Sequence, residues 1–241
     1  MERAAPLRWL ENRFLGRHLR GRGMEIGALW RRFPAPRRAR VWYADRLSAG
    51  GLAEHYPELK GRILASDLVA DAAQLPVAPA SLDFLIASHL LEHLPFPLAA
   101  LRAWYEALAP GGVLLLKIPD KRYTFDARRE RTSLAHLLEE YEHPARFEAR
   151  AHYEDWVEHV GGRSRESLEF ESEVRDLMRR DYSIHFHVWT GADIREIIEF
   201  TRNAWKLDWD PEVFWGAHFY RKETTVLLRR AGGEPGARPA A

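Results

Sequence analysis

Five residues with small or polar side chains follow stretches whose composition is typical of β-strands. Glu25 and Gly27 lie at the end of the first stretch, and Asp45 ends the second. Asp71 lies in the loop after the third stretch, and His89 follows the fourth. Ligands bind at the carboxyl ends of the strands in an open α/β sheet, where a carboxylate such as Asp45 accepts hydrogen bonds from ribose hydroxyl groups. An Asp in the third loop is placed to bond an adenine amino group, and the combined spacing of the strand ends is more informative than any one of these residues.

The elements that must position these residues alternate between strand and helix. Strands are expected at residues 24–27, 40–44, 62–65, 82–88, 113–118, 205–215 and 224–228, and helices at residues 6–20, 48–56, 97–109 and 192–202. The stretch from Val113 to Ile118 is nearly all apolar, as in a strand that is buried on both faces. Pro110 to Gly112 is expected to form a turn before it. This alternation predicts an α/β doubly wound fold with a mostly parallel sheet.

The chain divides into a sheet-forming part and additions to it. Residues 121–190 are charged, aromatic and mostly helical, and they are too long for a simple loop. We expect them to form a helical cap inserted after the fifth strand, with aromatic residues that either line a pocket or form the cap's own core. The sheet domain then comprises residues 23–120 and 191–230, preceded by a basic amphipathic helix at 1–22. A flexible tail is expected at 231–241.

Composition excludes several classes of protein. The chain has no cysteine, so disulfides, thiol nucleophiles and cysteine metal sites are impossible. It lacks Gly-x-Gly-x-x-Gly and a phosphate loop with Gly-Lys-Ser/Thr, the main motifs that would indicate an NAD enzyme or a P-loop NTPase. No apolar run is long enough to span a membrane and no signal peptide is evident, so a cytoplasmic location is expected. Residues 1–40 carry eleven Arg and only three Glu. This basic region could bind phosphates, pair with the acidic remainder of the chain or be exposed to solvent.

Four motifs occur in the order and spacing of one enzyme family: Asp71-Ala72-Ala73-Gln74-Leu75-Pro76, Ser81-Leu82-Asp83-Phe84, Leu91-Glu92-His93-Leu94 and Leu108-Ala109-Pro110-Gly111-Gly112-Val113-Leu114. With them the sequence resembles class I S-adenosylmethionine-dependent methyltransferases over about residues 23–120, and less closely over 191–230. The resemblance implies a Rossmann-like, seven-stranded, mostly parallel sheet with a helical insertion. It also implies S-adenosylmethionine as the cofactor.

The resemblance assigns roles to the strand-end residues. In this family the acidic residue and the glycine after the first strand hold the methionine part, the acidic residue after the second strand binds the ribose, and the Asp of the third loop reaches the adenine. The cofactor-binding residues implied in this way are Glu25, Gly27, Ala28, Asp45, Asp71, Ala72 and Ser88. The chain departs from the family pattern at two positions, because Glu25 replaces the usual Asp and Leu29 replaces the second Gly.

A narrower resemblance concerns the methyl acceptor. Glu-Ile-Gly-Ala at residues 25–28 and the stretch from Pro119 to Asp126 resemble methyltransferases that accompany glycosyltransferases in surface-polysaccharide pathways. This implies transfer to oxygen or nitrogen of a small molecule, such as a sugar or glycan precursor. Lys121, Arg122 and Tyr123 follow the fifth strand and are expected at the mouth of the site, where cations suit a phosphate or carboxylate on the acceptor.

A base is needed if the acceptor is a hydroxyl group, and histidine suits this role near neutral pH. His89 is the first candidate because it ends the fourth strand, and His187 and Asp120 are further candidates. His89-x-x-Glu92-His93 also matches an inverted zinc-protease motif, but prolines at 95 and 97 leave little room for the long helix that such a site needs. His185 and His187 form a possible metal pair. We expect no metal, so activity should survive EDTA.

Two other functions remain open at this stage. A nucleic-acid methyltransferase, acting on RNA for example, would use the basic N-terminal helix to hold phosphates. Against it, Ser88-His89-Leu90-Leu91 does not match the Asn/Asp-Pro-Pro-aromatic pattern of enzymes that methylate base amino groups. The altered glycine pattern also allows a non-catalytic cofactor-binding module. The sequence predicts no oligomeric state.

Overall fold

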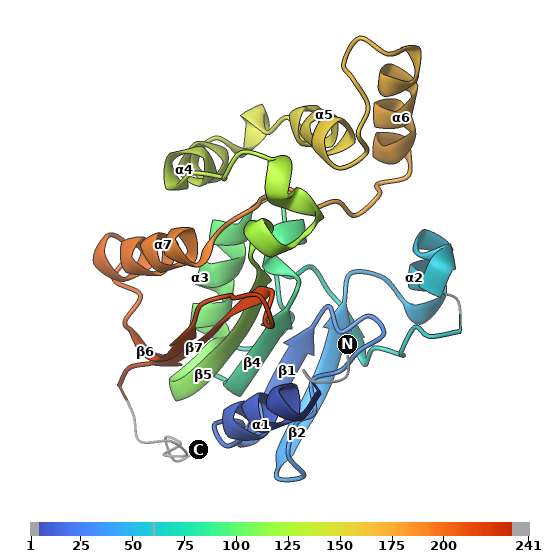
Figure 1. The fold of residues 1–241 in the computed structure, drawn as a ribbon. Helices are drawn as coiled ribbons and strands as arrows, with labels where there is room; N and C mark the ends of the chain where they lie inside the picture. The colour runs from blue at the N-terminus through green and yellow to red at the C-terminus, as the bar shows by residue number, and fades with distance from the viewer. Residues whose placement is uncertain (1–4, 60, 233–241) are drawn as a thin grey trace.

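The computed structural model describes residues 5–59 and 61–232 and has one sheet at its centre (Figure 1). Its strands are β1 (Gly21–Ile26), β2 (Ala39–Asp45), β3 (Leu68–Val69), β4 (Leu82–Ser88), β5 (Leu108–Pro119), β6 (Trp209–Trp215) and β7 (Glu223–Arg230). They form a seven-stranded sheet in the order β3-β2-β1-β4-β5-β7-β6. Strands β1 to β5 pair in parallel, and β7 runs antiparallel to β5 and β6. The predicted Rossmann-like fold with a mostly parallel sheet is confirmed.

Helices cover both faces of this sheet and extend beyond one end of it. They are α1 (Ala5–Gly16), α2 (Ala49–His55), α3 (Pro97–Ala107), α4 (Leu134–Glu142), α5 (Ala149–His159), α6 (Leu168–Arg179) and α7 (Gly191–Asn203). Leu114 and Leu116 of β5 pack in one buried cluster with α3 and α7, whereas Leu115 packs on the other face with Leu15 of α1. Successive side chains of a strand point to opposite faces, which is why a continuous apolar run suits β5. No helix among the described residues is long and apolar enough to cross a membrane.

The segment between β5 and α7 carries α4, α5 and α6 and lies over the carboxyl ends of the parallel strands (Figure 1). It has a buried apolar cluster of its own, which comprises Tyr153, Val157, Phe170, Val174, Leu177, Ile184 and Phe186. Several of its aromatic residues therefore pack with one another. We refer to residues 121–190 as the cap.

Element boundaries differ from expectation at four places. The third strand is Leu68–Val69 and not 62–65, because Leu64 donates its N–H to Leu29 O in the loop after β1 and not to β2. Residues 110–112 belong to β5, which passes through an irregularity in its pairing with β4, and Gly111 adopts a positive φ of 79° there. Strand β6 begins at Trp209 and not at residue 205, and Lys206, before it, has a left-handed backbone with φ 57°.

The fourth difference is at the N-terminal helix, which ends at Gly16 and not at residue 20. Leu15 and Leu19 are fully buried against the sheet, whereas Leu7 and Leu10 are 59% and 56% exposed. The expected amphipathic face is therefore only partly used in packing. The expected flexible tail at 231–241 lies, from residue 233 onward, outside the described residues.

Candidate functional site

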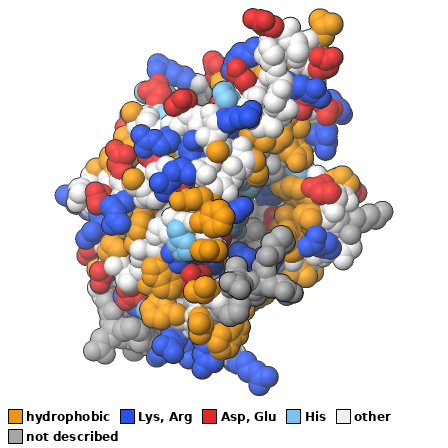
Figure 2. Space-filling model, in the orientation of Figure 1, with side chains coloured by type: hydrophobic (Ala, Val, Ile, Leu, Met, Phe, Trp, Pro, Cys, Tyr) orange, Lys and Arg blue, Asp and Glu red, His pale blue; other side chains and the backbone are white. Residues whose placement is uncertain are grey.

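Three adjoining cavities lie at the carboxyl ends of the central strands. Cavity A has a volume of about 360 Å³ and is lined by Gly27, Asp45, Asp71 and His89, together with Phe186 of the cap. In the view of Figure 2 the surface is hollowed below α6, between α2 and the centre of the molecule. Four of the five strand-end residues, Gly27, Asp45, Asp71 and His89, therefore lie around this cavity.

Cavity B extends from cavity A toward α1 and measures about 410 Å³. Gly27 and His89 line both cavities, whereas Glu25 lines cavity B but not cavity A. Ala28 and Ser88 line cavity B as well. Polar side chains from outside the predicted set complete its wall; they are Arg8, Asn12, Arg31, Arg32 and Lys117.

Cavity C, of about 730 Å³, lies between the start of the cap and the loop before β7. Tyr123, Phe125 and Tyr220 give it an aromatic wall, and His185 and Glu223 add polar groups. His89 lines cavity C in addition to A and B. Its imidazole therefore stands where the three cavities meet.

The turn after β1 requires its glycine. Gly27 has φ 70°, and a Cβ added there would lie 2.9 Å from Leu90 Cδ1. Glu25 is buried, and its two carboxylate oxygens accept the N–H of Phe33 at 2.9 and 3.0 Å. Burial raises the pKa of Glu25 to about 7, against the opposing effects of that N–H and of Arg32. A cation that entered cavity B would stabilise the ionised carboxylate.

Asp45 and Asp71, two of the three aspartates that line cavity A, are held by backbone groups. Asp45 is 8% exposed and its Oδ1 accepts the N–H of Arg46 at 2.8 Å. Burial raises the pKa of Asp45, and the N–H groups of Arg46 and Leu29 oppose the rise. Asp71 Oδ1 accepts the N–H of Ala73 at 2.7 Å, which turns the loop so that Ala72 also lines the cavity.

His89 belongs to a chain of charged groups. Its Nε2 lies 2.7 Å from Glu223 Oε2, and Glu223 Oε1 accepts a hydrogen bond from Lys117 Nζ at 2.9 Å. Its Nδ1 lies 3.7 Å from Oε1 of Glu92, a carboxyl group that is almost fully buried. Burial alone would lower the pKa of His89, but Glu223 and Glu92 together raise it above its ordinary value. His89 itself adopts φ 53°, a left-handed conformation that is uncommon for residues other than glycine.

Glu223 and Lys117 are not among the site residues predicted from the sequence. One signal was present, because Lys117 interrupts an otherwise apolar run that the sheet buries on both faces. A buried lysine requires a partner. Nothing in the sequence identified that partner, because Glu223 lies 106 residues further along the chain. Glu223 has its pKa lowered: burial acts to raise it, but the hydrogen bonds from His89 and Lys117 outweigh burial.

Four other predicted residues do not line cavities A, B or C. Asp120 is fully buried and bonds Arg122 and the N–H of Gly191, so it joins the cap to α7. Lys121 Nζ donates to Ala127 O. His187 is fully buried inside the cap. Of the three residues expected at the mouth of the site, only Tyr123 lines one of these three cavities.

Comparison with solved structures shows similarity of fold. A Rhodobacter sphaeroides protein described as a Zn-dependent alcohol dehydrogenase is 16% identical with a TM-score of 0.55, over 92% of this chain and 90% of that one. A Pyrococcus horikoshii OT3 protein is 12% identical with a TM-score of 0.51, over 95% and 92%. The CurJ carbon methyltransferase is 17% identical with a TM-score of 0.45, over 89% of this chain and 50% of that one. This chain thus spans about half the length of that enzyme.

Comparison with protein families identifies the chemistry. No curated protein sequence matches the chain. A family model described as a methyltransferase domain matches residues 17–163, which include β1 to β5 and the strand-end residues of cavities A and B. The match covers more than half of the 241 residues. The chain therefore belongs to the methyltransferase domain family, as a class I methyltransferase that uses S-adenosylmethionine as its cofactor.

Proposed function

We propose that the chain transfers a methyl group to oxygen or nitrogen of a small molecule that binds in cavity C. Cavity A would hold the nucleoside part of S-adenosylmethionine and cavity B its methionine part. The observation that carries this proposal is the position of His89, which lines all three cavities. A single imidazole at their junction is placed to act between the methyl donor and the acceptor.

The residues of cavities A and B fit this cofactor. Asp45 is a carboxylate at the end of β2, where a ribose would meet it, and Asp71 lies in the loop that would face the adenine. Gly27 has no side chain, so the backbone of the turn is open to the ligand. In cavity B, Glu25 supplies a carboxylate for an ammonium group and Arg8 a guanidinium for a carboxylate.

The same geometry gives the basic N-terminal helix a role at the small-molecule site. Arg8 and Asn12 of α1 line cavity B, and Arg8 also lines cavity C. Arg8 Nη2 lies 3.8 Å from Glu223 Oε2, with its side chain about half exposed. We infer that α1 closes the methionine end of the site.

Bound S-adenosylmethionine supplies a methyl carbon that its positive sulfur already activates, so the protein must orient the acceptor and remove its proton. The Glu223 carboxylate accepts the Nε2–H of His89, which leaves the lone pair on Nδ1, 3.7 Å from Glu92 Oε1, to take a proton. Lys117 holds Glu223 from the other side. In this arrangement His89 is the base, and Glu223 is a positioning residue that fixes its tautomer and raises its pKa.

The lining of cavity C favours a ring-shaped, polar acceptor. Tyr123, Phe125 and Tyr220 present flat apolar faces, and His185 and His218 present hydrogen-bonding groups beside them. Aromatic faces combined with polar edges suit a sugar, so a sugar or glycan precursor is the acceptor class that we propose. Turnover on a panel of sugars, nucleotide sugars and small amines, followed as S-adenosylhomocysteine formation, tests it. Turnover on RNA alone would contradict it.

The Asp45→Ala substitution is expected to weaken S-adenosylmethionine binding by at least about tenfold, because the ribose hydroxyl groups lose a charged acceptor. Isothermal titration calorimetry measures the dissociation constant directly. Glu54→Ala is the matched control, because Glu54 is an exposed carboxylate on α2 that lines none of the three cavities. Equal affinities for the two variants would remove Asp45 from the cofactor site.

Tyr123→Ala is expected to raise KM for the acceptor while the dissociation constant of S-adenosylmethionine stays within about threefold of wild type. The reason is that Tyr123 lines cavity C but neither A nor B. Steady-state kinetics on an acceptor from the panel and calorimetry with the cofactor measure the two effects. A loss of cofactor affinity with an unchanged acceptor KM would show that cavity C is not the acceptor site.

A further inference from the structure

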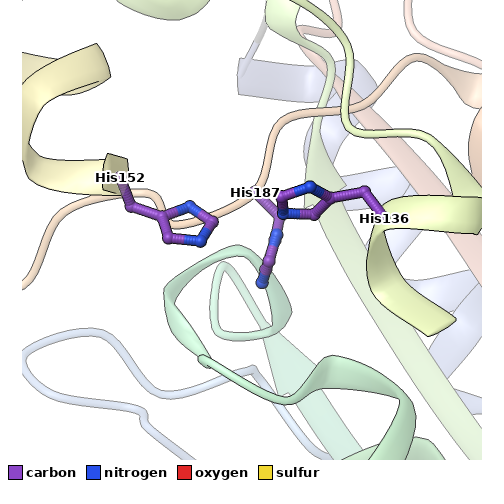
Figure 3. A group of neighbouring side chains, drawn as sticks. All are labelled: His136, His152 and His187. Atoms are coloured by element: carbon purple, nitrogen blue, oxygen red, sulfur yellow. The ribbon is translucent and has the colours of Figure 1, made fainter. Parts of the chain in front are cut away.

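Three histidines from separate segments of the cap come together (Figure 3). His136 lies on α4, His152 on α5 and His187 in the segment that leads to α7. One ring nitrogen of each lies within 4.8 Å of those of the other two. Glu140 Oε1 lies 3.0 Å from His136 Nε2 and 2.7 Å from His152 Nε2, and its Oε2 lies 3.6 Å from His187 Nε2. None of these four residues lines cavity A, B or C.

Backbone carbonyl groups orient two of the three rings. His152 Nδ1 donates to Phe186 O at 2.9 Å, and His187 Nε2 lies 3.2 Å from Pro95 O. A neutral His152 that donates from Nδ1 turns the lone pair of Nε2 toward Glu140 Oε1. Two acceptors at that distance need a proton or a metal ion between them. Histidines that bind metals commonly donate their second ring nitrogen to a carbonyl group in this way.

Two buried polar atoms of the group are left without a hydrogen-bond partner in the part of the chain that the structure describes. Among the described residues, Glu140 Oε2 and His187 Nδ1 are buried and have no hydrogen-bond partner. A buried carboxylate oxygen and a buried imidazole nitrogen that both lack a partner are stabilised by a cation between them.

We propose that His136, His152, His187 and Glu140 bind a zinc ion. Three imidazoles and a carboxylate are ligands that zinc prefers, and four protein ligands complete a tetrahedral site of the structural kind. Zinc–nitrogen bonds of about 2.0–2.1 Å place the ligand atoms about 3.3 Å apart, so side-chain shifts of about 1 Å would close the site. The His136 side chain is 48% exposed, which gives the ion a path from solvent.

The proposed ion would connect parts of the cap that are distant in sequence. It would join α4, α5 and the segment before α7, and in that segment Phe186, next to His187, lines cavity A. This departs from the absence of metal expected from sequence. The His185–His187 pair considered there is split between two groups, because His185 Nδ1 bonds Asp126 Oδ2 at 2.7 Å.

Metal content and zinc titration of the full chain test the proposal. We expect about one zinc per chain after purification or reloading, and a rise in Tm of several degrees when zinc is added to EDTA-treated protein. Cobalt should give the intense visible absorption of a tetrahedral site. His136→Ala and, independently, His152→Ala should abolish all three signals. His143→Ala should keep them, because His143 is a partly exposed histidine at the end of the same helix α4.

A second group of possible metal ligands, Glu92, His93 and His185, provides the competing outcome. Loss of zinc in His93→Ala with full retention in His136→Ala would place the ion at that group and overturn the proposal. So would wild-type protein that shows neither zinc binding at micromolar concentration nor a shift in Tm. Circular dichroism of each variant distinguishes loss of the site from loss of the fold.

Discussion

Arg129→Met is expected to destabilise the protein by about 3–5 kcal/mol. The substitution breaks a buried ion pair and leaves the negative charge of Asp126 without the guanidinium that compensates it. Arg129 is 2% exposed and Asp126 is 1% exposed, with Arg129 Nη1 3.0 Å from Asp126 Oδ1. The same guanidinium donates to Asp155 Oδ2 at 2.6 Å and to His185 O at 2.8 Å. It therefore holds three parts of the cap together.

Urea unfolding measures this effect, and Arg128→Met is the matched control. Arg128 is the preceding residue and is exposed, so its replacement should change the free energy of unfolding by less than about 0.5 kcal/mol. Hydrogen exchange locates the change: amides of α5 and of residues 184–189 should lose protection first. A free energy of unfolding within about 1 kcal/mol of wild type for Arg129→Met would show that Arg129 does not anchor the cap.

The sheet could be predicted from sequence because its signals are local. The apolar run of β5, the alternation of strands and helices and the polar residues at the strand ends each occupy a few consecutive positions. The edge strand β3 was misplaced because it comprises two residues, Leu68 and Val69, which is too short for a periodic pattern. The turn expected at residues 110–112 is a pairing irregularity within β5, and neighbouring β4 determines it.

Asp45, Asp71 and His89 could be predicted to lie close together because parallel strands end at one edge of the sheet. The partners of His89 could not be predicted in this way. Glu223 reaches it from β7, which enters beside β5 in the antiparallel direction after the whole cap. The same limit applies to the proposed zinc site. His136, His152 and His187 have no motif spacing, and only the tertiary arrangement of α4, α5 and the segment before α7 brings them together.

The pairing of His89 with Glu223 leads to the second large expected effect. His89→Gln should lower the rate of methyl transfer to a hydroxyl acceptor by about a hundredfold or more, because the site loses its base. In the wild type the rate should fall as the pH falls through the pKa of His89, since only the neutral imidazole accepts a proton. That midpoint should lie above the ordinary value of a histidine, because Glu223 and Glu92 favour the protonated form.

Glu223→Gln separates the positioning role from simple support of the fold. Without the negative charge of Glu223 the pKa of His89 should fall, so the acid limb of the pH profile should move to lower pH while the rate at its plateau decreases. Histidine NMR of the enzyme without an acceptor records the same midpoint and reports whether Nε2 carries the proton. Glu212→Gln is the control, because Glu212 pairs with His18 and lines none of the three cavities. A His89 midpoint that Glu223→Gln leaves unchanged, or a rate that His89→Gln leaves within about threefold of wild type, would exclude this pair from the proton transfer.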